Sequence, residues 1–78
     1  MAVPDQEEIF ARMADVLGLA ESRLRADVLL TDLVSDSYRL VEMAIELQDD
    51  YDVIFSQSDL STVSTVGDLA ELVRSRAT

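Results

Sequence analysis

The sequence predicts an all-α fold: a small four-helix bundle of three main helices and one short helix, with a long first loop. Apolar residues recur at helical spacing in three separate segments. Only one Pro and two Gly interrupt the 78 residues, so few positions break a helix. Cys and His are absent, so neither disulfides nor zinc bound by those residues can stabilise the chain. We therefore expect residues 1–78 to form a single domain that helix packing alone stabilises.

The first helix is expected from Asp5 to Leu17. Ile9, Met13 and Leu17 are spaced four residues apart and form one apolar stripe. Gly18 then ends the helix, because glycine readily adopts the left-handed conformation common at helix ends.

The connection from residue 19 to residue 36 lacks helical periodicity and is predicted to be a long loop. Leu24, Leu30 and Leu33 are expected to anchor it to the core, so the loop should be ordered.

The second helix, from Ser37 to Asp50, has the clearest amphipathic pattern. Its apolar face consists of Leu40, Met43, Ala44, Leu47 and Tyr51. Its opposite, mostly acidic face carries Tyr38, Arg39, Glu42, Ile45, Glu46 and Asp49.

The C-terminal third should hold one short helical turn at 58–62 and a final helix that starts at Thr65. Thr65 and Asp68 have the spacing of a capping box. The stretch 53–55 has strand-like composition, but a lone strand has no partner in this fold.

The charge balance is 16 acidic residues against 6 basic ones, a net charge of -10. Such a chain is repelled by nucleic acid and by anionic membranes, so we expect protein partners with basic surfaces. No segment resembles a signal peptide or a membrane span, and a cytoplasmic monomer is expected.

No metal site and no catalytic site are expected. Asp49, Asp50 and Asp52 lack the glycine and the closing Glu of a calcium loop, which favours a solvated helix end. The carboxylates of Glu42 and Glu46 share an exposed face, whereas acid–base catalysis needs carboxyl groups in contrasting environments.

Ser37 is the candidate functional residue. Ser37 or the preceding Asp36 can simply cap the second helix. Alternatively, the Ser37 hydroxyl carries a phosphodiester, which the free backbone N–H groups of a helix start would favour. Physical reasoning alone leaves both interpretations open.

The motif Asp32-Leu33-Val34-Ser35-Asp36-Ser37-Tyr38 resembles the Asp-Leu-Gly-x-Asp-Ser-Leu motif of acyl carrier proteins. The family's Thr-Val-Gly-Asp is intact at residues 65–68, and the resemblance spans about residues 5–75. The chain departs from the family pattern at Val34, Tyr38, Arg39 and Ile54, among others.

The resemblance implies that Ser37 receives 4'-phosphopantetheine from coenzyme A through a separate phosphopantetheinyl transferase. The flanking motif residues are Leu33, Asp36 and Tyr38. The chain would then be a non-catalytic carrier whose arm holds acyl groups as thioesters, for polyketide or fatty-acid-like biosynthesis.

The resemblance also implies two contact surfaces. Partners such as a ketosynthase or an acyltransferase would dock basic patches on Tyr38, Arg39, Glu42, Ile45, Glu46 and Asp49. An acyl chain would lie among Leu40, Met43, Ala44, Leu47 and Val63.

Two alternative functions remain open. One is an aminoacyl or peptidyl carrier, although the glycines typical of its motif are absent before Ser37. The other is an unmodified interaction module that uses only its acidic helix.

Overall fold

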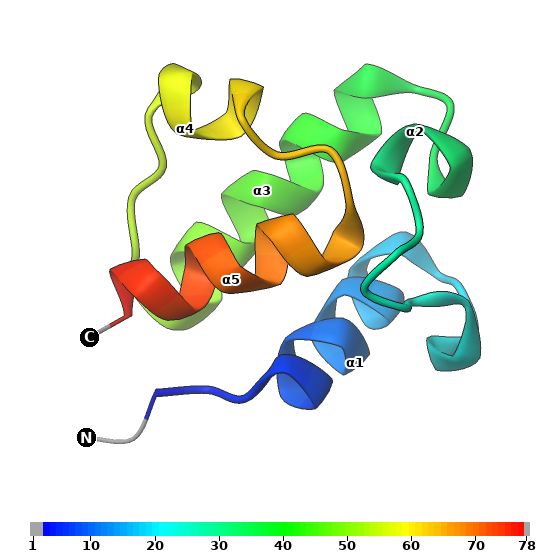
Figure 1. The fold of residues 1–78 in the computed structure, drawn as a ribbon, viewed down its shortest axis with the longest axis horizontal. Coiled ribbons are helices and arrows are strands. Elements are labelled where there is room, and N and C mark those ends of the chain that lie inside the picture. Colours follow the sequence, from blue (N-terminus) through cyan, green and yellow to red (C-terminus); the bar gives the residue numbers. More distant parts are fainter. Residues whose placement is uncertain (1–2, 78) are drawn as a thin grey trace.

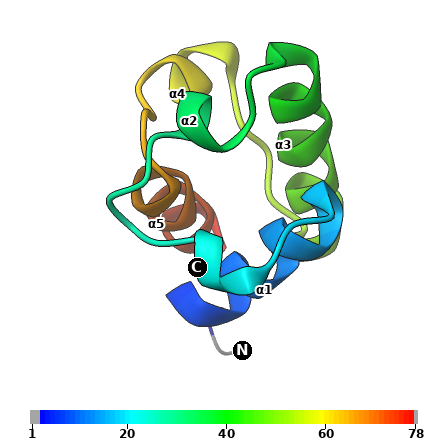
Figure 2. The same ribbon diagram turned by 90° about the vertical axis from the view of Figure 1, so that its right-hand side faces the viewer.

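The computed structural model describes residues 3–77, except for the side chain of Ser37. Three long helices, α1 (Gln6–Leu17), α3 (Ser37–Tyr51) and α5 (Val66–Arg76), pack around one core (Figures 1 and 2). Two short helices, α2 (Leu30–Leu33) and α4 (Gln57–Ser61), both lie on the upper side of the bundle as drawn in Figures 1 and 2, apart from each other in Figure 1. The predicted all-α class is confirmed.

The long first loop is more structured than predicted. It is ordered, and Leu24, Leu30 and Leu33 are all buried, as expected. It also contains a 3-10 turn, η1 (Glu21–Arg23), and the helix α2, neither of which was predicted. Both are too short to produce a helical period in the sequence, because a period needs several turns.

The core consists of the apolar faces of the three long helices, together with side chains from the connections. In the predicted stripes of α1 and α3, Ile9, Met13, Met43 and Leu47 are fully inaccessible to solvent, whereas Leu40 and Tyr51 of α3 are only partly buried. The other buried residues are Ala14, Leu17, Leu24, Leu30, Leu33, Ala44, Val53, Phe55, Val66, Leu69, Ala70 and Val73.

The helix ends follow their sequence signals. The side chain of Asp5 caps α1 by accepting the N–H of Glu8 at 2.9 Å, and Gly18 ends the helix with φ 69°. Thr65 and Asp68 form the predicted capping box at the start of α5. These interactions are local, so the sequence alone predicts them.

The first turn of α5 is joined to the loop before α2 by backbone hydrogen bonds. Val66 N–H donates to Val28 O at 2.9 Å, and Gly67 N–H donates to Ala26 O at 3.1 Å. A Cβ atom at Gly67 would lie 2.9 Å from Ala26 O, so only glycine permits this approach. The contact anchors the long loop against α5.

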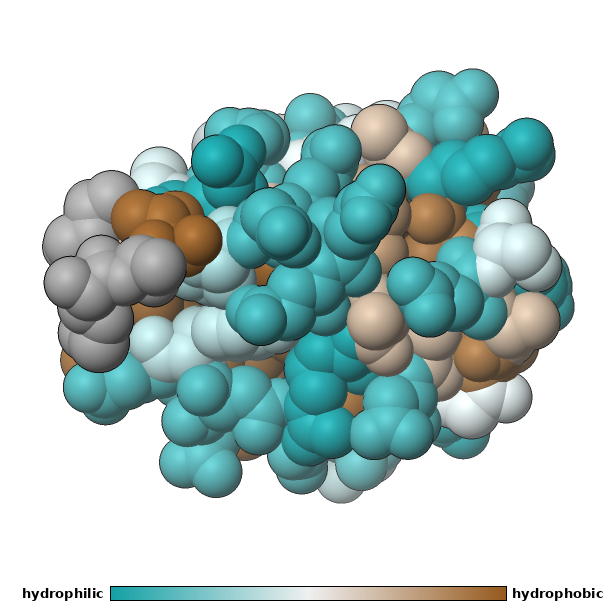
Figure 3. Space-filling view, turned by 90° about the horizontal axis from the view of Figure 1, so that it is seen from below, coloured by the Kyte–Doolittle hydropathy of each residue, from teal (hydrophilic) through white to brown (hydrophobic). Residues whose placement is uncertain are grey.

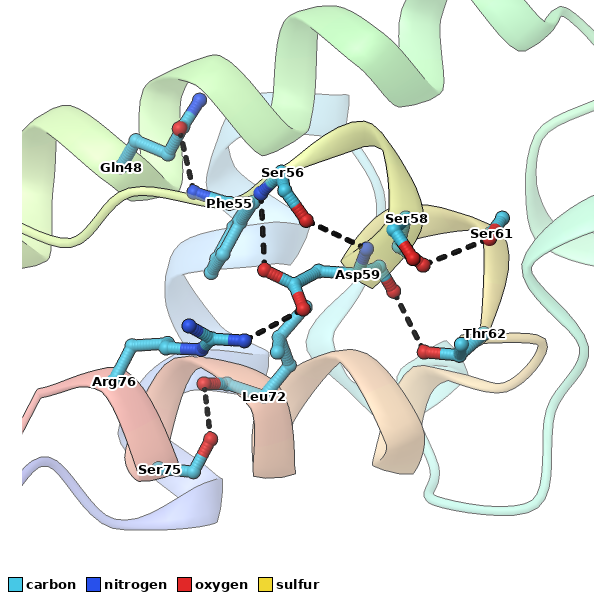
Figure 4. A network of polar contacts seen from close by, with 10 residues as sticks. All are labelled: Gln48, Phe55, Ser56, Ser58, Asp59, Ser61, Thr62, Leu72, Ser75 and Arg76. Atoms are coloured by element: carbon cyan, nitrogen blue, oxygen red, sulfur yellow. Dashed lines mark hydrogen bonds and ion pairs between the residues drawn. The ribbon is translucent and has the colours of Figure 1, made fainter.

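The segment that follows α3 is not a strand. Asp52 adopts the left-handed conformation (φ 53°) and reverses the chain. Val53 and Phe55 are then buried against the core, and Phe55 N–H donates to Gln48 Oε1 at 2.9 Å (Figure 4). The predicted turn at 58–62 is confirmed, shifted by one residue, as α4.

Asp59 stabilises the short helix α4 through two interactions. Its carboxylate completes a capping box with Ser56 and pairs with Arg76 of α5, at 2.6 Å (Figure 4). Backbone donation from Ser56 lowers the pKa of Asp59 below its usual range. The ion pair joins α4 to the C-terminal end of α5.

The surface on the α1 side of the molecule is mostly hydrophilic, with small apolar patches between the polar side chains (Figure 3). Arg12 of α1 forms a hydrogen-bonded ion pair with Asp50 of α3. The hydrogen bond to Asp50 raises the pKa of the Arg12 guanidinium. Within residues 3–77, no helix is long and apolar enough to cross a membrane.

Candidate functional site

The N-terminal end of α3 places Ser37 as the first helical residue, directly after the cap. Asp36 is that cap, and its Oδ1 accepts the N–H of Tyr38 at 3.0 Å. The N–H groups of Arg39 and Leu40 donate to the Asp36 carbonyl. The expectation of free N–H groups was therefore wrong for residues 38–40, because Asp36 accepts all three.

The turn before Ser37 does not require a glycine. Val34 has φ -137° and ψ 117°, which is extended backbone that a β-branched residue adopts readily. Leu33 is buried and anchors α2 to the core, whereas Ser35 and Asp36 are exposed. Thus Val34, which replaces the family's glycine, fits the conformation observed here.

The chain around Ser37 lies at the surface. The residues on both sides of Ser37, namely Ser35, Asp36, Tyr38 and Arg39, are all exposed. The start of α3 is therefore a solvent-facing part of the molecule. The side chain of Ser37 itself lies outside the described residues.

The outward face of α3 presents the residues that were predicted to bind partners. Tyr38 is 69% exposed and Ile45 is 56% exposed. The remaining exposed members of this face are Arg39, Glu42, Glu46 and Asp49. The structure therefore brings all six together on one solvent-facing side of a single helix.

Arg39 has a structural contact that its position in the sequence did not reveal. Its guanidinium donates to the backbone carbonyl of Leu17, at 3.2 Å. This carbonyl belongs to the last turn of α1, where a positive charge also interacts favourably with the helix dipole. Arg39 therefore joins the start of α3 to the end of α1.

The carboxylates at the C-terminal end of α3 are not all solvated, contrary to the prediction. Asp49 and Asp52 are exposed, but Asp50 pairs with Arg12, so this end is not simply solvated. Among the described residues, no group of three or more carboxylates is arranged to hold a metal ion.

A pocket of about 360 Å³ lies between α3 and the short helices α2 and α4, with one lining residue from α5. Its lining is mostly apolar and consists of Leu29, Leu30, Thr31, Leu40, Val41, Met43, Ala44, Leu60, Val63, Ser64 and Leu69. A flexible aliphatic chain could enter it, because few polar groups there would lose hydrogen bonds to water.

Four of the five residues predicted to line an acyl cavity meet at this pocket: Leu40, Met43, Ala44 and Val63. The fifth, Leu47, lies one turn further along α3 and is completely buried in the core. Sequence reasoning missed the lining residues of α2 and α4, whose helices are too short to show a pattern.

Comparison with known proteins gives a consistent result. A family described as "Phosphopantetheine attachment site" matches residues 7–73. An acyl carrier protein of Thermotoga maritima is 30% identical over 76 residues, covering 91% of this chain and 94% of the relative. One of Rhodococcus erythropolis is 34% identical over 74 residues, covering 88% of this chain and 81% of the relative.

The fold and these matches define a small helical domain that carries a phosphopantetheine attachment site. More narrowly, the chain belongs to the acyl carrier protein family. Its cofactor is therefore 4'-phosphopantetheine.

Proposed function

We propose that Ser37 is the attachment residue and that the chain is a non-catalytic carrier of acyl groups for polyketide or fatty-acid-like biosynthesis. The observation that carries this proposal is the position of Ser37. It is the first residue of α3, follows the cap Asp36, and lies within the matched residues 7–73.

The roles of this chain's own residues follow from that position. Asp36 caps α3 and holds the backbone on both sides of Ser37, so a phosphopantetheinyl transferase would find this serine at a defined start of a helix. Once bound, the cofactor supplies a terminal thiol that holds acyl groups as thioesters. The cysteine-free chain needs no thiol of its own.

The partners of this carrier would be the transferase and synthase enzymes such as a ketosynthase or an acyltransferase. The outward face of α3 combines exposed carboxylates with the apolar side chains of Tyr38 and Ile45. A basic patch on an enzyme would approach it quickly, because the net charge of -10 attracts positive surfaces. We further propose that residues 1–78 act as one cytoplasmic, monomeric carrier domain.

The pocket beside α3 is the proposed site for an acyl chain. Leu40, Met43 and Ala44 contribute to it from α3, and Val63 from the connection between α4 and α5. A chain within it would be protected from water while the domain travels between enzymes.

The test is the intact mass of the protein after incubation with coenzyme A, Mg²⁺ and a broad-specificity phosphopantetheinyl transferase. We expect the wild type to gain one phosphopantetheine and Ser37→Ala to gain none. Ser35→Ala is the matched control, since it removes an exposed hydroxyl two residues away and should still be modified. Modification of Ser37→Ala, or none on a folded wild type, would reject Ser37 as the attachment residue.

A further inference from the structure

A surface hollow lies beside the start of α3, next to the proposed attachment residue. It measures about 290 Å³ and is open to solvent. Ser35 and Asp36, which directly precede Ser37 in the chain, line one part of it. The other lining residues are Leu17, Leu19, Leu33, Val34 and Arg39. The hollow therefore combines an apolar wall with one guanidinium, beside the segment that carries Ser37.

Two residues that line this hollow depart from the acyl carrier protein pattern, namely Val34 and Arg39. Val34 is partly buried against the core and adds an apolar side chain where the family has a glycine. Arg39 is exposed and adds a positive charge to a chain whose net charge is -10. Both departures therefore change the same hollow, one by its apolar surface and the other by its charge.

The tertiary structure brings Arg39 to the hollow. Residues two positions apart lie on different sides of a helix, so the sequence by itself does not place Arg39 near Ser37. In the structure, Arg39 nevertheless lines the same hollow as Ser35 and Asp36. Its guanidinium is held there because it donates to the carbonyl of Leu17, at 3.2 Å. A guanidinium has five N–H donors, so most of them remain for another acceptor.

The charge of Arg39 is not neutralised within residues 3–77. Three other arginines each form an ion pair with a carboxylate, whereas no carboxylate of the described chain forms one with Arg39. Two acids lie near enough to line a cavity with it: Asp36 in the hollow and Glu42 in a second cleft. Asp36 already accepts the N–H of Tyr38. Arg39 is therefore able to pair with an anion that is not part of the chain itself.

We propose that the hollow holds the first part of the 4'-phosphopantetheine arm, a proposal that rests on the proposed function because it needs the arm on Ser37. Arg39 would pair with the phosphodiester, since a guanidinium donates two parallel hydrogen bonds to phosphate oxygens. The pantoyl group follows the phosphate in this arm and carries two methyl groups on one carbon. These methyl groups match the apolar wall that Val34 and Leu19 provide.

Arg39 would thereby act as a positioning residue for the arm. Among the described residues, the hollow and the proposed acyl pocket share no lining residue. Leu33 of α2 borders the hollow, whereas Leu30 of the same helix borders the pocket. Pairing with Arg39 would therefore favour arm positions at the hollow over positions at the pocket.

The experiment compares the unloaded and loaded forms of the full chain by NMR, after intact mass has measured the loading of Ser37. The proteins are the wild type, Arg39→Gln, the conservative Arg39→Lys and Val34→Ala. Arg25→Gln is the matched control, because it removes the same charge from an exposed arginine outside the hollow. Each loaded variant is compared with its own unloaded form, so loss of the hydrogen bond to Leu17 affects both members of the pair.

In the wild type, we expect nuclear Overhauser effects from the pantoyl methyl groups to Val34 and Leu19, and a shift of the Arg39 Nε–H signal on loading. Arg39→Gln should weaken the Overhauser effects by about threefold, because an exposed ion pair has a modest free energy. Arg39→Lys and Arg25→Gln should retain most of their intensity. Val34→Ala should weaken the effect to Leu19 but leave the shift of Arg39 Nε–H.

Three results would overturn the proposal. One is a loaded wild type without these Overhauser effects, and another is equal effects in the wild type and Arg39→Gln. The third is an equal loss in Arg25→Gln, which would show that net charge alone is responsible. Absence of loading on Ser37 would reject the proposed function together with the proposal, whereas a loaded but freely moving arm would reject only the role of Arg39 and the hollow.

Discussion

At the scale of single residues, Asp68 stabilises the start of α5 through its charged form. Its carboxylate accepts the N–H groups of Ser64 at 3.1 Å and Thr65 at 3.2 Å. These two backbone hydrogen bonds lower the pKa of Asp68 below its usual range. A lowered pKa in the folded state means that the stabilisation is complete above the unfolded pKa, and is lost as the pH falls through the folded pKa.

The variant Asp68→Asn tests this contribution. We expect it to be less stable than the wild type at pH 7, and the difference in melting temperature should shrink as the pH falls below about 4. Thermal unfolding at pH 7, 5, 4 and 3 measures the difference. Asp32→Asn makes the same change in net charge at an exposed position and corrects for general charge effects. A difference that stays constant at every pH would contradict the role given to the Asp68 carboxylate.

Arg39 lies on the outward face of α3 and also contacts α1. It lies on the face of α3 that we propose for docking, yet its guanidinium donates to the carbonyl of Leu17 in α1. A guanidinium has five N–H donors, so this hydrogen bond does not exhaust it. Arg39 is therefore held by the fold while its remaining N–H groups stay available to a partner.

At the scale of elements, the long first loop depends on its contact with α5. Two backbone hydrogen bonds join the loop to the first turn of α5, and a third runs from Leu30 N–H to Ser64 O, just before α5, at 2.9 Å. The same contact sets the position of α2, which contributes Leu30 to the pocket. The pocket therefore depends on how closely the loop approaches the first turn of α5.

The variant Gly67→Ala should push the first loop away from the first turn of α5. Alanine has the higher helix propensity by about 1 kcal/mol, but its Cβ would collide with backbone atoms of Ala26. We expect a net destabilisation of about 1–3 kcal/mol, measured by urea unfolding.

Gly18→Ala provides the comparison for that variant, because it is strained by its positive φ and meets no neighbouring atom. Only Gly67→Ala should accelerate hydrogen exchange at Leu30 and Val66. Unchanged exchange at both amides would show that the loop accommodates the methyl group without releasing α5.

At the scale of the whole molecule, the excess of negative charge opposes folding. The ion pairs of Arg12, Arg74 and Arg76 compensate only part of the 16 acidic residues. At about 0.01 M salt, the screening length of roughly 30 Å is comparable to the longest dimension of the molecule, 32 Å. Carboxylates on opposite sides therefore repel one another at low salt.

Added salt should consequently raise the melting temperature. We expect an increase of several degrees between about 0.01 M and 0.3 M NaCl, because the screening length falls well below the size of the protein. Calorimetry or circular dichroism measures the change. Since salt also weakens the ion pairs, a flat or falling melting temperature would show that those pairs outweigh the general repulsion.

Features that depend only on neighbouring residues could be predicted without the structure. The apolar stripes around Ile9 and Met43, the cap at Asp5, the stop at Gly18 and the capping box at Thr65 all involve residues within one or two helical turns. Interactions at such short range leave a period or a motif that can be read directly.

Only the tertiary structure decided the features that join distant residues. Arg12 pairs with Asp50 of α3, and Arg39 donates to the backbone carbonyl of Leu17 in α1, so each contact joins two separate helices. The pocket likewise needs α2 and α4, whose few residues carry no period, to be placed against α3. Whether an apolar residue such as Phe55 or Ile54 is buried or exposed depends on what packs against it, and packing is a property of the assembled fold.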